Sequence, residues 1–177
     1  MQLYDPQMQK DNCGFGLIAH LEGEASHKLI KTAIKGLDRM QHRGGIAADG
    51  KTGDGCGLLI QKPDSFFQSI ASENGWSLGK KYGVGMVFLN PDPVIAAQTK
   101  AILEEELTKE TLTLVGWRVV PTDKDILGEI AAGNLPLIEQ VFVNAPPGWR
   151  NKDLERRLYM ARRRAEKRIE DSVFYVA

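Results

Sequence analysis

Residues 13–21 read CGFGLIAHL, a cysteine followed by eight residues in which two sets of side chains alternate. Successive side chains of an extended chain point to opposite sides, so one face of this stretch carries the larger apolar set. Its members are Phe15, Leu17, Ala19 and Leu21. The alternation predicts a β-strand over residues 14–21 with one buried face.

Cys13 stands directly before this predicted strand and after a polar leader, residues 1–12. If the leader is removed, Cys13 carries a free α-amino group, whose pKa of about 8 makes it a base near neutral pH. An ordinary thiol is only slightly ionised there, so an amine that accepts its proton would activate it as a nucleophile. The alternative is a strand cysteine that packs as a small apolar residue, and the local pattern leaves both open.

A helix is predicted next, from an N-cap at Ser26 to about Met40. Apolar residues recur at helical spacing between these two positions, and the glycines at 44 and 45 end the pattern.

Arg43 falls at the end of this helix, in the sequence Gln-His-Arg-Gly. The helix dipole favours a cation in the last turn, so Arg43 can be read as a C-terminal cap. The functional alternative places it beside Cys13, where it would orient backbone or stabilise negative charge. His42 is a weaker candidate for a catalytic base, because a histidine in a last turn is usually solvated or capping.

Residues 52–57 read TGDGCG, with a glycine at every second position. A phosphate-binding loop would open a helix, whereas this segment leads into a predicted strand over residues 57–61. Alternating glycines instead clear one face for close packing. Cys56 is interpreted as a packing residue, since nothing near it in sequence offers a base.

The remaining elements follow from periodicity and turn signals. We predict strands over residues 82–89, 112–120, 137–143 and 172–177, and helices over 63–71, from Pro91 and Asp92 to about 109, and from an Asn151 cap onward. Residues 122–134 stay unassigned. The final apolar strand lacks a following turn, which indicates that the chain is the front part of a longer protein.

Basic residues gather on the last predicted helix: Arg156, Arg157, Arg162, Arg163, Arg164, Lys167 and Arg168. Acidic residues are interleaved with them, and no set of aromatic residues is spaced for base stacking. We therefore expect a solvated face or a contact with another domain, and no nucleic-acid partner.

The composition is that of an ordinary globular domain, with 23 basic and 23 acidic residues among 177. Zero net charge gives no general attraction to nucleic acid or to anionic membranes. No apolar run approaches the roughly 20 residues that span a bilayer, and the leader lacks the apolar core of a secretory signal. We expect a cytoplasmic protein without membrane contact, and its two cysteines make neither a disulfide framework nor a zinc site.

Five segments together resemble the start of the glutaminase domain of glutamate synthase large subunits. They are DNCGFGLIAH (11–20), MQHRGG (40–45), DGKTGDGCGLL (49–59), FVNAPPGWR (142–150) and RRLYMARRR (156–164). The resemblance implies an α+β fold of the N-terminal nucleophile hydrolase type, an αββα sandwich of mainly antiparallel sheets that is incomplete in this chain. It also implies a propeptide at 1–12, and at 13–177 the first portion of a type 2 glutamine amidotransferase domain that continues beyond the chain.

The same resemblance implies a reaction and its residues. Cys13 would attack the γ-carboxamide of glutamine, release ammonia and leave a glutamyl thioester for hydrolysis, with Arg43 beside it. The family's oxyanion and glutamine-gripping residues have no match up to Ala177, so no substrate-binding residue is identified here. An oxyanion donor is typically worth about 10² to 10³ in turnover, so we expect the isolated chain to be nearly inactive.

Glutamine and the downstream synthase domains, in the same or a separate chain, are the implied partners, with an electron-donating small subunit as a further one. Ammonia would pass to the synthase domain for reductive transfer to 2-oxoglutarate in glutamate biosynthesis. That domain would hold FMN and an iron–sulfur cluster. This chain is expected to hold no cofactor and no metal, because two cysteines cannot ligate such a cluster and no flavin fingerprint is present.

Two alternatives stay open. Another class II amidotransferase, such as an amidophosphoribosyltransferase, shares the Cys-Gly and Gln-His-Arg-Gly motifs but gives no account of TGDGCG. A non-catalytic interaction domain would contain Cys13 as an ordinary structural residue.

Overall fold

A computed structural model describes residues 14–40 and 44–177 of the chain. Contacts divide the molecule into two compact units. The first contains the chain up to Gln61 together with Asp125–Gly133, and the second contains Lys62–Lys124 and Asn134–Ala177. Because each unit is compact by itself, they are described in turn.

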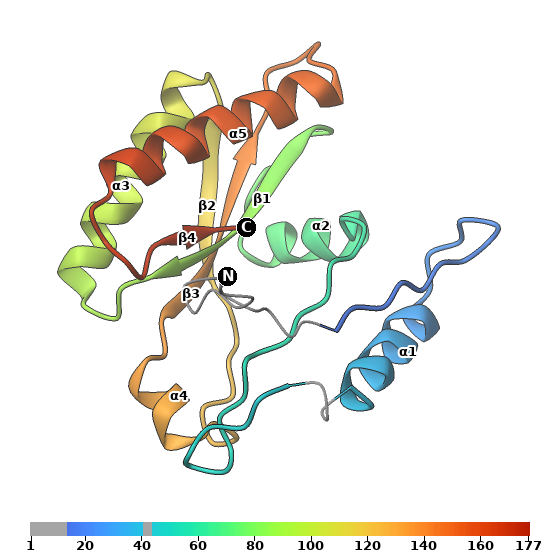
Figure 1. Ribbon diagram of the computed structural model, residues 1–177. Helices are drawn as coiled ribbons and strands as arrows, with labels where there is room; N and C mark the ends of the chain where they lie inside the picture. Colours follow the sequence, from blue (N-terminus) through green and yellow to red (C-terminus); the bar gives the residue numbers. More distant parts are fainter. Residues whose placement is uncertain (1–13, 41–43) are drawn as a thin grey trace, which may run out of the picture. The chain divides into compact units, whose positions relative to one another are not determined.

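The second unit is built on one antiparallel sheet of four strands in the order β2-β3-β1-β4 (Figure 1). The strands are β1 (Tyr82–Leu89), β2 (Thr113–Val119), β3 (Leu137–Asn144) and β4 (Tyr175–Val176). β1 and β3 pair along their full length, from Tyr82 opposite Asn144 to Leu89 opposite Leu137. The central pair therefore forms the rigid middle of the sheet.

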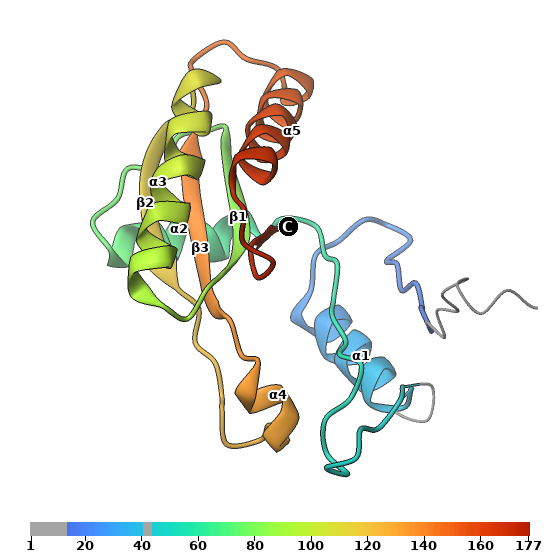
Figure 2. The ribbon, with the colours of Figure 1, turned by 60° about the vertical axis from the view of Figure 1, so that its left-hand side comes forward.

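One face of this sheet is covered by two long helices, α3 (Pro93–Lys109) and α5 (Asn151–Arg168) (Figures 1 and 2). Val87 and Leu89 of β1 point to these helices and are fully buried. Asp92 caps α3 by accepting the amide hydrogen of Val94 at 2.8 Å, as expected for an aspartate before a helix.

The opposite face of the sheet packs on α2 (Asp64–Glu73). Phe67 of α2 meets Phe142 of β3 edge to face, with ring centroids 5.7 Å apart. The buried Tyr82 donates its hydroxyl hydrogen to Asp64 at 2.5 Å. Burial and the nearby carboxylate raise the pKa of Tyr82 well above its usual range. The central strands are thus buried on both faces.

The predicted elements of this unit are confirmed, with two corrections. The predicted final strand shortens to Tyr175–Val176. The cap of α5 is Arg150 instead of Asn151, which is already helical. Asp153 closes the first turn, because its carboxylate accepts the Arg150 backbone amide hydrogen at 3.0 Å.

The first unit contains α1 (His27–Asp38) and the short α4 (Glu129–Gly133), which lies in the stretch left unassigned above. Ser26 is the N-cap of α1, as predicted, and its Oγ accepts the Leu29 amide hydrogen at 3.3 Å. Residues 14–21 and 57–61, both predicted as strands, lie outside any helix or strand, so those two predictions are wrong for this structure.

The physical reason is that a strand needs a neighbour for its backbone hydrogen bonds. The described residues supply none to these two stretches, and their apolar side chains face solvent: Phe15 is 94% exposed and Leu17 90% exposed. The α+β class and its antiparallel sheet are confirmed, whereas the described residues form one layer of sheet instead of the two of the expected sandwich.

Candidate active site

The two predicted catalytic residues, Cys13 and Arg43, lie outside the described residues, as does His42. The structure describes the chain on both sides of them: the stretch that begins at Gly14, the helix α1, and residues 44–57.

Residues 45–54, which we call the motif hairpin, fold back on themselves. Ile46 and Gly53 form an antiparallel bridge, and the Ala47 amide donates to the Thr52 carbonyl at 2.8 Å. Gly50 takes a φ of +68° at the turn, in the left-handed region that favours glycine. The hairpin brings the end of MQHRGG against the start of TGDGCG.

Asp54 ties these two motifs together. Its Oδ2 accepts the Gly45 amide hydrogen at 2.8 Å. A Cβ atom at Gly45 would lie only 3.0 Å from the same carboxylate oxygen, so the glycine leaves room for the bond. Asp54 thereby holds the backbone two residues after Arg43.

Asp49 organises the turn of the motif hairpin. Its Oδ1 accepts the amide hydrogens of Lys51 at 3.1 Å and of Thr52 at 2.8 Å, and its Oδ2 accepts the Thr52 hydroxyl hydrogen at 2.5 Å. These bonds, led by the one from the Thr52 hydroxyl, hold the pKa of Asp49 well below its usual range. Asp49 is therefore a carboxylate at neutral pH.

The side chains of Asp49 and Thr52 also bind the start of α4, about eighty residues further along the chain. Asp49 Oδ2 accepts the Ile130 amide hydrogen at 3.1 Å, and Thr52 Oγ1 accepts that of Ala131 at 3.2 Å. Sequence reasoning assigned no role to Asp49. The Asp-Gly turn signal at 49–50 could have indicated the turn, but nothing local indicates its partner in α4.

The alternating glycines of TGDGCG serve different purposes. Gly55 takes a φ of +87°, which glycine adopts most readily. A Cβ at Gly53 would lie 3.5 Å from the Gly45 carbonyl oxygen, whereas Gly57 has open space around it. Because 3.5 Å is an ordinary van der Waals distance, the described residues show the expected close packing at none of the three glycines. Cys56 is an exposed free thiol, so its interpretation as a packing residue is wrong.

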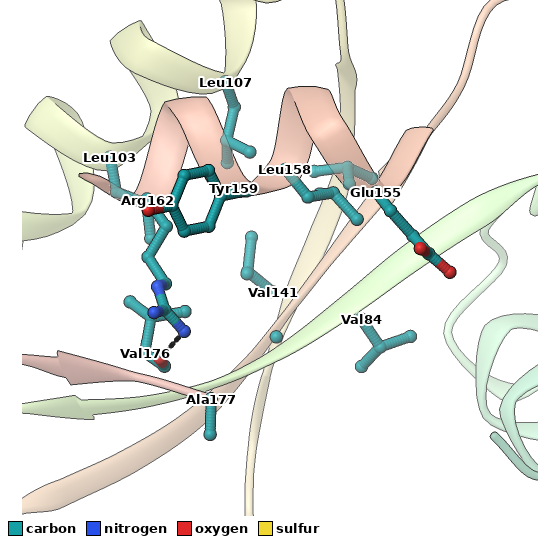
Figure 3. Close-up of a pocket in the computed structure, with 12 residues that line it drawn as sticks. Val84, Leu103, Leu107, Val141, Glu155, Leu158, Tyr159, Arg162, Val176 and Ala177 are labelled. Atoms are coloured by element: carbon teal, nitrogen blue, oxygen red, sulfur yellow. Dashed lines mark hydrogen bonds between the residues drawn. The ribbon is translucent and has the colours of Figure 1, made fainter. Parts of the chain in front are cut away.

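A cavity of about 290 Å³ lies in the second unit, between the sheet and the α3 and α5 helices (Figure 3). Its walls are mostly aliphatic, from Leu103, Leu107, Val141 and Leu158 among others. Arg162 closes one side by donating to the Val176 carbonyl at 3.4 Å. Two charged side chains, Glu155 and Arg162, also line the cavity, and Arg162 is already bound to the Val176 carbonyl and paired with Glu166.

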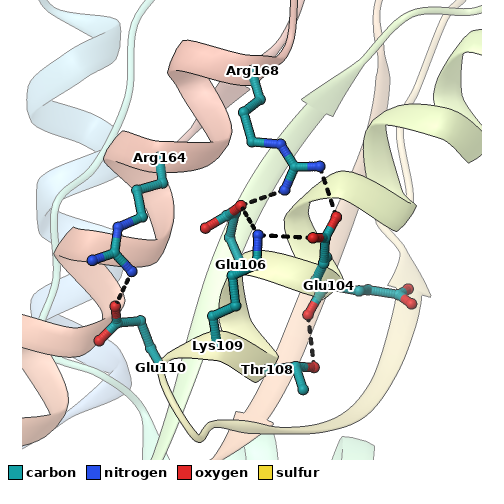
Figure 4. Close-up of polar contacts among 8 residues, drawn as sticks. Glu104, Glu106, Thr108, Lys109, Glu110, Arg164 and Arg168 are labelled. Atoms are coloured by element: carbon teal, nitrogen blue, oxygen red, sulfur yellow. Dashed lines mark hydrogen bonds and ion pairs between the residues drawn. The ribbon is translucent and has the colours of Figure 1, made fainter.

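Arginines of α5 form ion pairs with acidic residues of α3 and with Glu110, which directly follows α3 (Figure 4). Arg157 and Arg164 both pair with the buried Glu110, and Arg168 pairs with Glu106 and Glu105. These three arginines remain exposed while they form ion pairs within their own unit, so the solvated face expected here is confirmed for them.

Within residues 14–40 and 44–177, no three His, Cys, Asp or Glu side chains come together as a metal site. Over the same residues, none of the helices combines the length and the apolar character that crossing a bilayer requires.

Residues 13–177 match the family described as glutamine amidotransferases class-II. The chain therefore belongs to the class II glutamine amidotransferase family, whose match begins at Cys13. Among its relatives are glutamate synthases. It is 40% identical over 170 residues to "Ferredoxin-dependent glutamate synthase 2" of Synechocystis sp., and 38% identical over 169 residues to "Glutamate synthase (NADPH) large chain" of Bacillus subtilis.

These alignments cover 95% and 93% of this chain but only 11% of each relative. The Azospirillum brasilense glutamate synthase large chain is 36% identical over 168 residues, again covering 11% of its length. The chain thus spans about a tenth of the length of these curated relatives. The predicted resemblance to glutamate synthase large subunits is confirmed.

Proposed function

We propose that this chain is the first portion of the glutamine amidotransferase module of a glutamate synthase, acting in the cytoplasm. The observation that carries the proposal is the family match from residue 13 onward, together with 36–40% identity to glutamate synthases over nearly the whole chain. The match starts at the residue that the chemistry of an N-terminal nucleophile requires.

In the proposed reaction, residues 1–12 are first removed, which frees the α-amino group of Cys13. That amine accepts the thiol proton, and the thiolate attacks the γ-carbonyl carbon of glutamine. The tetrahedral intermediate collapses when the carboxamide nitrogen leaves as ammonia with the transferred proton. Water then hydrolyses the thioester, so that glutamine and water become glutamate and ammonia.

Arg43 is proposed to stabilise the surroundings of the nucleophile through its planar, multi-donor guanidinium. The motif hairpin supports this role, because the Asp54 bond and the Ile46–Gly53 bridge hold the backbone from the second residue after Arg43 onward. An ordered segment on one side of a catalytic side chain reduces the conformations that the side chain samples.

The second sheet of the sandwich is proposed to include residues 14–21 and 57–61. Both stretches have strand-like sequences, and both leave large apolar side chains in solvent, with Leu21 95% exposed and Leu59 fully exposed. Large apolar side chains exposed in this way are typical of a face that another element covers. In the complete protein, further strands would cover it.

The ammonia is proposed to pass to synthase domains elsewhere in the protein, which transfer it to 2-oxoglutarate. The iron–sulfur cluster is proposed to lie in those domains, because such clusters take several cysteine ligands and this chain has two cysteines. FMN is proposed to bind in those domains as well. The electron donor is proposed to act on those domains too.

The proposal is tested by Cys13→Ala in the full-length protein. Glutamine-dependent glutamate formation should be abolished, while much of the ammonia-dependent reaction remains, since the synthase domain performs its own chemistry. Cys13→Ser should behave almost alike, because a hydroxyl is a far weaker nucleophile at neutral pH.

Cys56→Ala is the matched control, since Cys56 is an exposed thiol without an assigned role, and it should keep turnover within a few-fold of the parent. Equal loss of both reactions in Cys13→Ala would show that Cys13 is structural.

An electrophilic glutamine analogue that labels Cys56, or nothing, would favour a non-catalytic interaction domain. Intact mass should show that the active protein lacks residues 1–12.

A further inference from the structure

We infer that Asp49 and Thr52 are positioning residues that fasten the connection between β2 and β3 to the motif hairpin. We call this arrangement the Asp49 latch: the side chains of Asp49 and Thr52 with the backbone amides of Ile130 and Ala131. Its link to glutamine turnover rests on the proposed function, whereas its existence as a contact does not.

The latch is a closed set of hydrogen bonds. The Thr52 hydroxyl donates to Asp49 Oδ2 at 2.5 Å and accepts from the Ala131 amide at 3.2 Å. Asp49 Oδ2 also accepts from the Ile130 amide at 3.1 Å. The first amides of a helix have no partner within the helix, so these two side chains satisfy donors that α4 leaves open.

Gly128 shows how closely the two segments approach. It is the only buried residue among the described residues of the first unit. A Cβ atom built there would overlap the Asp49 carboxylate, the Thr52 hydroxyl and the Thr52 backbone nitrogen. The glycine backbone therefore lies directly against the latch, and no larger residue fits without moving it.

The segment held by the latch, residues 125–133, lies within the long connection between β2 and β3. Residues 120–136 connect two neighbouring strands of the second unit, yet residues 125–133 within them belong by their contacts to the first unit. A connection between antiparallel strands needs only a few residues, so its length here reflects another role. The latch supplies that role by joining the connection to the motif hairpin.

The hairpin transmits the restraint toward the proposed active site. From Thr52 the chain continues to the Ile46–Gly53 bridge and the bond from the Gly45 amide to Asp54. Gly45 is two residues after Arg43 in the chain. If the hairpin loses its anchor, the segment that follows Arg43 loses its fixed position.

The test uses the full-length protein with Thr52→Val, which removes the hydroxyl and keeps the shape, and with Thr52→Ser, which keeps the hydroxyl. Lys51→Gln is the matched control in the same turn, because the Lys51 side chain is not part of the latch. Gly128→Ala tests the close approach separately.

Two measurements are made on each variant. The first is the rate of hydrogen exchange in peptides that cover residues 125–133, and the second compares turnover with glutamine and turnover with ammonia. Thr52→Val and Gly128→Ala should lower exchange protection of 125–133 by about tenfold or more, the factor that one hydrogen bond represents. They should lower kcat/KM for glutamine and leave the ammonia-dependent rate unchanged. Thr52→Ser and Lys51→Gln should match the parent in both.

Unchanged exchange in Thr52→Val and Gly128→Ala would overturn the latch. Faster exchange with unchanged glutamine turnover would overturn its positioning role. If the parent protein itself lacks glutamine-dependent activity, the proposed function fails, while the exchange measurement still decides whether the latch exists.

Discussion

At the scale of single residues, the size of the loss in turnover distinguishes a structural from a catalytic role for Arg43. Arg43→Lys keeps the charge, so a helix-capping role predicts turnover close to that of the parent. Lysine cannot reproduce the planar set of donors. The loss of two charge-assisted hydrogen bonds would lower glutamine-dependent turnover by about 10² or more, and we expect this result.

Turnover and thermal unfolding should be measured on the same full-length Arg43→Lys preparation. The melting temperature should stay nearly unchanged, since the effect is on the reaction. Normal turnover would remove Arg43 from the active site, and a large drop in melting temperature would assign it a structural role.

Gly116 of β2 is a second residue with a sharp prediction. It follows an irregularity in the pairing of β2 with β3, and a Cβ there would lie 2.5 Å from two ring atoms of Trp76. Gly116→Ala should therefore lower the free energy of unfolding by about 1 to 3 kcal/mol, the usual result of overpacking. Chemical denaturation measures it.

Gly36→Ala is the control for this substitution, because nothing lies within 4 Å of the Cβ it would add. Gly36 lies in the last turn of α1, where alanine is still the better helix former, so this variant should be as stable as the parent or slightly more stable. A Gly116→Ala protein of parental stability would show that the indole moves aside freely.

At the scale of elements, the contact between α3 and α5 makes stability depend on pH. Lys109 and Arg168 hold the pKa of the buried Glu106 below its usual range, against the effect of burial. Arg168 and Lys109 also lower the pKa of Glu105 to about 2, from an ordinary value of 4.5. Both carboxylates are therefore more easily ionised in the folded protein than in the unfolded chain.

A carboxyl group with a lowered pKa stabilises the fold above its ordinary pKa, and this contribution is lost as pH falls toward the folded value. The free energy of unfolding should thus decrease from about pH 5 to about pH 2. Glu106→Gln should be less stable than the parent at neutral pH, and the difference should shrink on acidification.

Denaturant unfolding of both proteins at neutral and acid pH gives this comparison. Glu73→Gln is the matched control, since Glu73 is an exposed residue at the end of α2, and it should follow the parent at every pH. Parallel curves for the parent and Glu106→Gln would show that the ion pairs do not contribute to the acid response.

At the scale of the whole molecule, the buried apolar core formed by residues 14–40 and 44–177 lies entirely in the second unit. Its two clusters cover opposite faces of the sheet, and all their members fall within residues 62–124 and 134–177. A domain folds by itself when it contains its own core. We therefore predict that the second unit folds alone.

The measurement uses residues 62–177 with 125–133 replaced by a short flexible linker. Thermal or denaturant unfolding should be a single cooperative transition, with near-ultraviolet dichroism from the packed Trp76 and Trp117. A gradual transition without such a signal would show that the second unit needs the first for its packing.

Much of the second unit could be predicted because its signals are local. Residues 82–89 are rich in strand-forming side chains and form β1 with those bounds, and Asp92 before Pro93 begins α3 as its type and position indicate. The motifs around Cys13 and Arg43 likewise indicated the family that the comparison confirmed. Residues 14–21 and 57–61 show the limit of this reasoning, because a strand also needs a partner.

The sequence by itself determined the class of protein, the proposed nucleophile and the positions of most helices and strands, since side-chain periodicity and short motifs depend only on neighbours along the chain. Only the tertiary structure decided that Arg168 of α5 binds Glu106 of α3, that Gly116 meets Trp76, and that Asp49 reaches α4. Each of these contacts joins segments far apart in the chain. Their geometry exists only once the chain has folded, so no local pattern encodes which groups will meet.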